Sequence, residues 1–123
     1  MNKSDRLLAA LAIALALVIL AQASALASPA EPVTIYYNRA CADCLHYIDD
    51  SIVPLLRQAG FAPPAYLDYV NEPANRASLL QHSEGLGVPS SFQSHLVVFI
   101  GERLILEGHI PQGVVSDLLQ APA

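Results

Sequence analysis

Lysine is almost absent from this chain, since Lys3 is the only one. The whole chain carries a formal charge of −5, and removing residues 1–27 would take away Lys3, Arg6 and Asp5, so that the rest carries −6. Surfaces that bind nucleic acid or anionic lipid need clustered cations. The composition therefore argues against both kinds of partner and predicts an acidic, soluble surface.

Several motifs are also missing. The sequence holds no glycine-rich loop that would cradle a nucleotide and no serine–histidine constellation that would suggest hydrolysis. It shows no internal repeat, and at 123 residues it is long enough for one domain and too short for two. These absences leave the cysteines and histidines as the residues that carry any chemistry.

The first 27 residues are typical of a targeting segment. Lys3 and Arg6 precede an uninterrupted apolar run at 7–21, and small residues at 23–27 offer A-x-A cleavage sites. The run has the length of a signal-peptide core, but counted through Ala27 it would also be long enough to cross a bilayer as an anchor. Either alternative predicts export, with the working domain outside the cytoplasm, periplasmic or at the cell surface.

Only two cysteines occur, Cys41 and Cys44, in the stretch "RACADCLHYIDD". In an oxidising compartment two cysteines would ordinarily suggest a structural disulfide. However, a bridge that closes so short a loop removes little entropy from the unfolded chain and is a poor staple. The spacing therefore favours chemistry over support.

The residues after the linker at 28–32 predict alternating strands and helices. Branched and aromatic residues indicate strands at 33–38 and 65–70, and two apolar runs around Gly101 indicate a hairpin at 95–107. Apolar residues at helical spacing indicate a helix from the cysteines to Gly60, with a kink or restart at Pro54, and further helices at 72–85 and 111–120. The predicted order is β-α-β-α-β-β-α.

A CxxC between the first strand and helix, followed by this order of elements, resembles the minimal thioredoxin-like α/β fold, here over residues 33–120 after an N-terminal signal or anchor helix. The resemblance implies that Pro89 is a cis proline that faces the cysteines, and that Val88 and Pro89 bind substrate. The stretches "VPSSFQSHLVV" and "ILEGHIP" also resemble a family of small exported thioredoxin-like domains that are suspected of metal binding. Members of that family commonly carry a cysteine where this chain has Ser94.

The cysteine spacing predicts a reactive pair. Both sulfurs would lie on the first turn of a helix, whose free N–H groups favour a thiolate at Cys41, while Cys44 would be the shielded resolving thiol. Between them, the negative charge of Asp43 opposes a thiolate and Arg39 offsets it, so these two residues are predicted to tune the couple. A reductase or electron relay is therefore expected rather than a disulfide-inserting oxidase.

The histidines leave a second interpretation open. The resemblance places His95 and His109 on the same rim as the cysteines, where Cys41, Cys44, His95 and His109 would suit zinc or cuprous copper. His46 and His82 are interpreted as surface or packing residues.

The sequence thus predicts an extracytoplasmic thiol-disulfide oxidoreductase that acts through Cys41 and Cys44 without a cofactor. Its partners would be protein thiols and disulfides and a membrane electron-transfer protein. The alternatives are a periplasmic-type copper or zinc binding protein and a degenerate fold that serves protein interactions alone.

Overall fold

The structure is a computed structural model that describes residue 2 and residues 31–122. The chain divides into two units, residues 1–30 and 31–123, within the linker predicted at 28–32. The signal peptide or anchor predicted at 1–27 lies outside the described residues, apart from residue 2, and stays a prediction. Within the described stretch, every helix is too short or too polar to cross a membrane.

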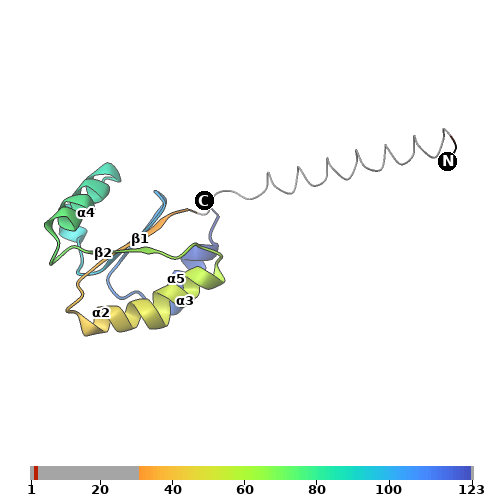
Figure 1. Ribbon diagram of the computed structural model, residues 1–123, viewed down its shortest axis with the longest axis horizontal. Coiled ribbons are helices and arrows are strands. Elements are labelled where there is room, and N and C mark those ends of the chain that lie inside the picture. The colour runs from red at the N-terminus through yellow and green to blue at the C-terminus, as the bar shows by residue number, and fades with distance from the viewer. Residues whose placement is uncertain (1, 3–30, 123) are drawn as a thin grey trace. The chain divides into compact units, whose positions relative to one another are not determined.

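Strands and helices alternate along the described chain in the predicted order, which gives a mixed α/β fold (Figure 1). The hairpin and the central position of the first strand are confirmed, because β1 lies between two other strands. The elements are β1 (Val33–Tyr37), α2 (Ala42–Tyr47), the π-helical turn η1 (Ile48–Ile52), α3 (Val53–Gln58), β2 (Ala65–Asp68), α4 (Pro73–Gly85), the 3₁₀ turn η2 (Ser90–Phe92), β3 (Val97–Ile100), β4 (Leu104–Glu107) and α5 (Gln112–Gln120).

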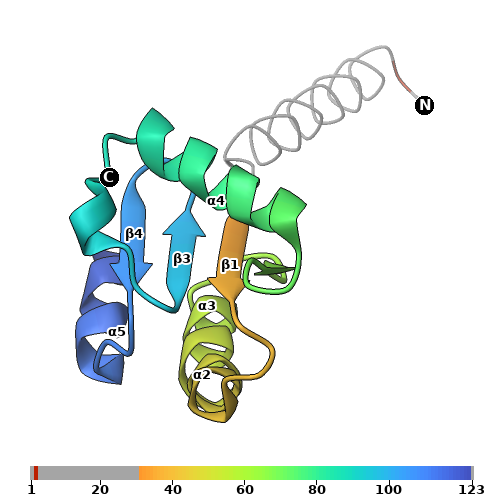
Figure 2. The same cartoon turned by 90° about the vertical axis from the view of Figure 1, so that its left-hand side faces the viewer.

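The four strands form one sheet in the order β2-β1-β3-β4. β2 runs parallel to β1, whereas β3 is antiparallel to both β1 and β4. The carboxyl ends of β1 and β4 therefore lie beside the amino end of β3, at one end of the strands (Figure 2). Loops from three separate parts of the chain converge there.

Helices cover both faces of the sheet, with α4 on one side and α2, α3 and α5 on the other (Figure 1). Every side chain of β3 is buried, and successive ones point to opposite faces. Val97 and Phe99 pack in the cluster on the α4 face, whereas Val98 and Ile100 join the larger cluster beneath the other helices. Cys44 belongs to this larger cluster, so the predicted site is anchored in the main core.

The long first helix loses its regular α-helical bonding just before Pro54, where the sequence predicted a kink or restart. Because proline has no N–H to donate to the carbonyl four residues earlier, the α-helical ladder cannot continue through it. The chain instead forms the π-helical turn η1, in which the Val53 N–H bonds to the carbonyl of Ile48, and α3 then continues to Gln58. Gly60, at φ +86°, ends the helix in a left-handed conformation, with the Phe61 N–H bonded to the Leu56 carbonyl at 3.0 Å.

The second strand ends two residues earlier than the predicted boundary at Val70. The Asp68 carboxylate accepts hydrogen bonds from the backbone N–H groups of Val70 and Asn71, both at 3.2 Å, and from the Asn71 side chain at 2.7 Å. These local bonds compete with strand pairing and turn the chain toward α4.

Candidate functional site

A tight turn after β1 sets the position of the first cysteine. The side-chain oxygen of Asn38 accepts the Ala40 N–H at 3.0 Å, and its backbone carbonyl accepts the Cys41 N–H at 2.9 Å. Cys41 keeps an extended backbone and is the N-cap of α2. The turn therefore delivers the sulfur of Cys41 to the start of a helix, next to N–H groups that lack a partner inside the helix.

Cys41 and Cys44 are joined by a disulfide, with their Cα atoms 5.3 Å apart. The Cys44 N–H also donates a hydrogen bond to the sulfur of Cys41, over 3.2 Å. Cys41 is partly exposed, whereas Cys44 is 0% exposed. The two residues thus differ in access to solvent, and the sulfur of Cys41 already receives a backbone donor that would stabilise a negative charge.

Two histidines stand next to the inner sulfur. His95 lies just before β3 and His109 just after β4, and the ligand atoms of Cys44, His95 and His109 all lie within 4.8 Å of one another. Both histidines are exposed while the cysteine is buried. The predicted convergence of these three residues on one rim is therefore confirmed.

Hydrogen bonds and ring contacts hold the loops that carry the two histidines. Gly108, at φ +76°, donates its N–H to the Leu96 carbonyl at 2.8 Å and so ties the end of β4 to the start of β3. His95 Nδ1 lies 3.3 Å from the Ser94 hydroxyl, and the His95 and His109 rings meet edge to face at 5.1 Å. The Ser94 N–H donates to the Glu107 carboxylate, although burial outweighs this bond and raises the pKa of Glu107.

Tyr47 is part of this support, a role that the sequence interpretation missed. Its ring stacks on that of His109 with centroids 4.8 Å apart, and its hydroxyl donates to the Ile110 carbonyl over 2.6 Å. Burial raises the pKa of Tyr47. One signal was present in the sequence, because Tyr47 follows Cys44 by three positions and so lies on the same side of the helix.

We expect Tyr47→Phe to lower the free energy of unfolding by about 1 kcal/mol, because it removes this hydrogen bond and leaves the Ile110 carbonyl without its donor. Unfolding by urea under oxidising conditions measures the effect. Tyr66→Phe is the matched control, since Tyr66 is 46% exposed. Equal losses in the two variants would contradict the supporting role of the Tyr47 hydroxyl.

The predicted cis proline is wrong. No peptide bond in residues 31–122 is cis, so the bond between Val88 and Pro89 is trans. Trans is the favoured isomer by about 0.5–1 kcal/mol, and here it leads directly into η2, where the Phe92 N–H bonds to the Pro89 carbonyl at 3.0 Å. Segment 94–96, rather than Pro89, immediately precedes β3 and brings a side chain to the cysteines.

Val88 and Pro89 line a shallow depression together with Ile105 and Glu107 of β4. Ile105 packs with the cluster on the α4 face, and side chains two apart on a strand share a face. The depression therefore opens on the opposite face of the sheet from the core around Cys44. Substrate binding by Val88 and Pro89 stays a prediction.

The two predicted tuning residues have different surroundings. Arg39 forms an ion pair with Asp68 at 3.1 Å, whereas Asp43 is exposed in the first turn of α2. The tuning effect of either residue on the cysteines stays a prediction.

The other two histidines lie apart from the cluster. His46 is exposed and pairs with Asp50 at 3.4 Å, as a surface residue would. His82, expected at the surface, is instead half-buried, because its ring stacks on Phe99 with centroids 3.8 Å apart.

Asp68 makes a pH-dependent contribution to stability. Burial alone would raise the pKa of Asp68, but hydrogen bonds from Asn71 and Val70, together with the charge of Arg39, outweigh burial and hold the pKa below its usual value. A carboxylate with a lowered pKa stabilises the fold above the unfolded-state pKa of about 3.9, and this contribution is lost as the pH falls through the folded-state pKa.

Asp68→Asn is therefore expected to be less stable than the wild type at pH 7, with a difference that shrinks below about pH 4. Urea unfolding at pH 7 and pH 3 measures both differences. Glu84→Gln, at an exposed position on α4, is the control. A deficit in Asp68→Asn that is the same at both pH values would contradict the assignment.

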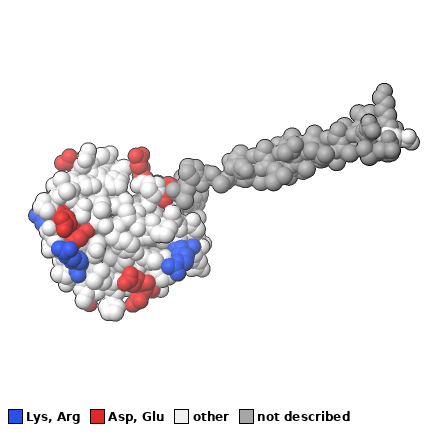
Figure 3. Space-filling view, in the orientation of Figure 1, with Lys and Arg blue, Asp and Glu red and all other residues white. Residues whose placement is uncertain are grey.

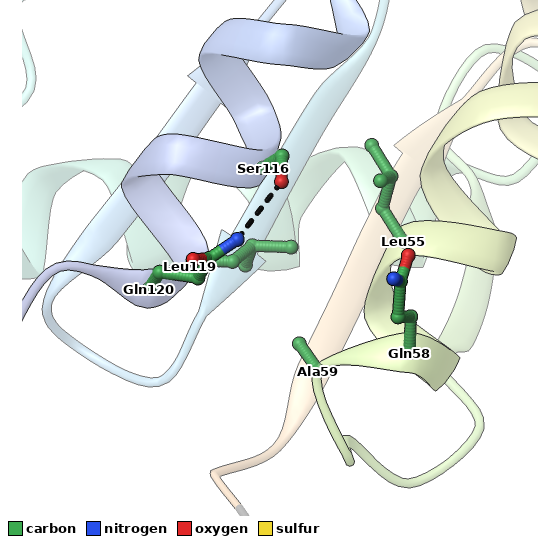
Figure 4. Close-up of a pocket in the computed structure, with 6 residues that line it drawn as sticks. All are labelled: Leu55, Gln58, Ala59, Ser116, Leu119 and Gln120. Carbon is green, nitrogen blue, oxygen red and sulfur yellow. Dashed lines mark hydrogen bonds between the residues drawn. The ribbon is translucent and has the colours of Figure 1, made fainter.

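A groove of about 210 Å³ lies between the C-terminal parts of α3 and α5 (Figure 4). Its side chains are apolar or uncharged, and Gln120 donates a hydrogen bond to Ser116 across 3.1 Å. It holds no cysteine, histidine or charged group and is formed away from the start of α2. The residues that line it are Leu55, Gln58, Ala59, Ser116, Leu119 and Gln120.

The face of the molecule in Figure 3 shows no cluster of basic side chains that would form a second binding site. The few basic side chains visible there lie apart from one another, among acidic ones. The cysteine–histidine cluster therefore remains the candidate site.

Comparisons of the chain with models of protein families, with curated proteins and with solved structures gave no match.

Proposed function

We propose that this protein is an extracytoplasmic, thioredoxin-like thiol-disulfide oxidoreductase that uses Cys41 and Cys44 as its redox couple. The observation that carries the proposal is the asymmetry of the pair: Cys41, at a helix start, is only partly buried and its sulfur accepts a backbone N–H, while Cys44 is fully buried in the core. A staple has no need of an accessible sulfur, whereas exchange requires one.

The reaction passes two electrons from the reduced pair to a client disulfide. The Cys41 thiolate attacks one client sulfur, which forms a mixed disulfide and releases the other client sulfur as a thiolate. Cys44 then loses its proton and attacks the Cys41 sulfur, which restores the Cys41–Cys44 disulfide and releases the second client thiol. The ligand atoms of His95 and His109 lie within 4.8 Å of the inner sulfur, and these two imidazoles are the groups that we propose to accept that proton.

The Asp43 carboxylate between the cysteines disfavours the thiolate and so raises the reducing power of the couple. We expect a reductase or relay, with a membrane electron-transfer protein as its donor. Equilibration of the metal-free protein with thiol buffers, read by mass spectrometry of alkylated cysteines, gives the reduction potential. A value well below about −120 mV supports this direction, and a value near about −120 mV, that of a strong oxidase, overturns it.

A second candidate function is the binding of zinc or cuprous copper as cargo, which the cluster of Cys44, His95 and His109 favours. A thiolate with two imidazoles is a donor set that both ions accept, and Cys41 would supply a fourth ligand. Ligand atoms in a tetrahedral zinc site are about 3.5 Å apart, so a contraction of about 1 Å is sufficient. Reduction of the disulfide must come first, because only the free thiolates can bind the ion.

A further inference from the structure

β4 is an edge strand with backbone groups that face outward. The hydrogen bond from the Gly108 N–H to the Leu96 carbonyl marks a bonded pair in the antiparallel ladder. Bonded pairs recur every second residue, so the backbone N–H and C=O groups of Leu106 and Leu104 also point toward β3. The backbone N–H and C=O groups of Ile105 and Glu107 therefore point away from β3. Within residues 31–122 no hydrogen bond takes up these outward groups.

An apolar depression lies beside this free edge. Phe92, the most exposed large apolar side chain in the described part of the chain, is 67% exposed there and lines the hollow with Pro89 and Ile105. The same two residues of β4, Ile105 and Glu107, supply both the wall of the depression and the outward backbone groups. A strand that paired with β4 would therefore bring its own side chains to the depression.

Glu107 gives the depression a charge preference. Its Oε2 atom is buried and has no hydrogen-bond partner, which is costly for a carboxylate unless a donor or cation is supplied. If β4 of a second copy of this chain paired here, the basic residue next to that strand would be Arg103. Arg103 already forms an ion pair with Glu31 at 2.6 Å, so it is poorly suited to neutralise Glu107. A partner of different sequence that carries a free basic side chain fits better.

We propose that the edge of β4 is the docking surface for an extended client segment that pairs with Ile105 and Glu107 and places a basic side chain beside the Glu107 carboxylate. This inference rests on the proposed function, because the end of β4 leads within two residues to His109 beside Cys44. A client segment paired with β4 would run toward His109 at the end of that strand, while its side chains fill the depression on the opposite face of the sheet from the core around Cys44.

A peptide without cysteine tests the docking surface separately from exchange. The probe is an extended eight-residue peptide with one central arginine, titrated into the full-length oxidised protein and followed by amide chemical shifts. We expect the largest shifts at Ile105 and Glu107, and at least about fivefold weaker binding when the peptide amides that face β4 are N-methylated. Equal affinity of the two peptides, or shifts confined to other strands, overturns the proposal.

A second comparison tests whether the Glu107 carboxylate recognises the basic side chain of the peptide. Citrulline in place of arginine is expected to weaken binding by at least about threefold, and Glu107→Gln is expected to remove this difference. Phe92→Ser is expected to weaken binding of the arginine peptide, while Leu118→Ser, at an exposed apolar position on α5, leaves it unchanged. An arginine preference that persists in Glu107→Gln overturns the role of Glu107.

Two further outcomes separate the proposals. Sedimentation that shows a dimer lost on Ile105→Pro would assign the edge to a second copy of the chain and overturn the client proposal. Proline at this position removes only an outward N–H group, so the ladder to β3 is retained. Peptide binding without any disulfide exchange would leave the docking surface in place and refute the oxidoreductase function.

Discussion

Replacing Cys41 by serine is expected to reduce disulfide exchange to the uncatalysed rate, because the serine hydroxyl stays protonated and cannot attack a disulfide. Cys44→Ser is instead expected to start the reaction but not to finish it, so that a stable mixed disulfide between Cys41 and the client accumulates. The buried position of Cys44 explains the difference, since only this sulfur is placed to resolve the intermediate. The effects should be among the largest of any single substitution.

The measurement uses a peptide with a fluorescent reporter across its disulfide for the rate, and mass spectrometry without reductant for the trapped species. Ser116→Ala, at the groove between α3 and α5, is the matched control and should exchange at the wild-type rate. An active Cys41→Ser variant would contradict the assignment of the nucleophile. A Cys44→Ser variant that accumulates no mixed disulfide would contradict the assignment of the resolving thiol.

Metal binding is expected to depend on the redox state of the two cysteines. The reduced protein should bind one zinc or cuprous ion, and the oxidised protein none, because the disulfide occupies both sulfurs. His95→Ala and His109→Ala should each weaken binding by more than about 100-fold, since loss of a ligand costs more than the 10–100-fold effect of losing an outer partner.

Competition with a chromophoric chelator in anaerobic buffer measures these affinities. His46→Ala is the control, because His46 is exposed and pairs with Asp50. Equal binding by the oxidised and reduced proteins would contradict the site. So would affinities of His95→Ala and His109→Ala that match that of the control.

The elements were predictable from the sequence where burial determines the pattern. The apolar run of β3 is buried along its whole length, and the hairpin to β4 follows from two such runs around Gly101. The loss of regular α-helical bonding just before Pro54 follows from the missing N–H of this proline. The boundary at Asp68 was not predictable from propensity, because the local hydrogen bonds of one carboxylate decide where the strand ends.

The meeting of His95 and His109 with the cysteines was predicted through the resemblance to the thioredoxin-like layout. With the strand order that the structure has, a loop before β3 and a loop after β4 reach the end of β1, which brings both histidines to Cys44. The ion pair of Arg39 with Asp68 depends on the register in which Tyr37 is opposite Asp68, and this register could not be read from the sequence. The isomer at Pro89 depends on its tertiary setting and was predicted by resemblance alone.

The central claim, an accessible nucleophile at Cys41 and a sealed partner at Cys44, is tested most directly by limited alkylation of the reduced, metal-free protein at pH 7. Mass spectrometry of the digested protein then gives the rate at each cysteine. The account predicts that Cys41 reacts at least about tenfold faster than Cys44, with the difference lost in urea. Equal rates in the folded protein, or faster alkylation of Cys44, would contradict it.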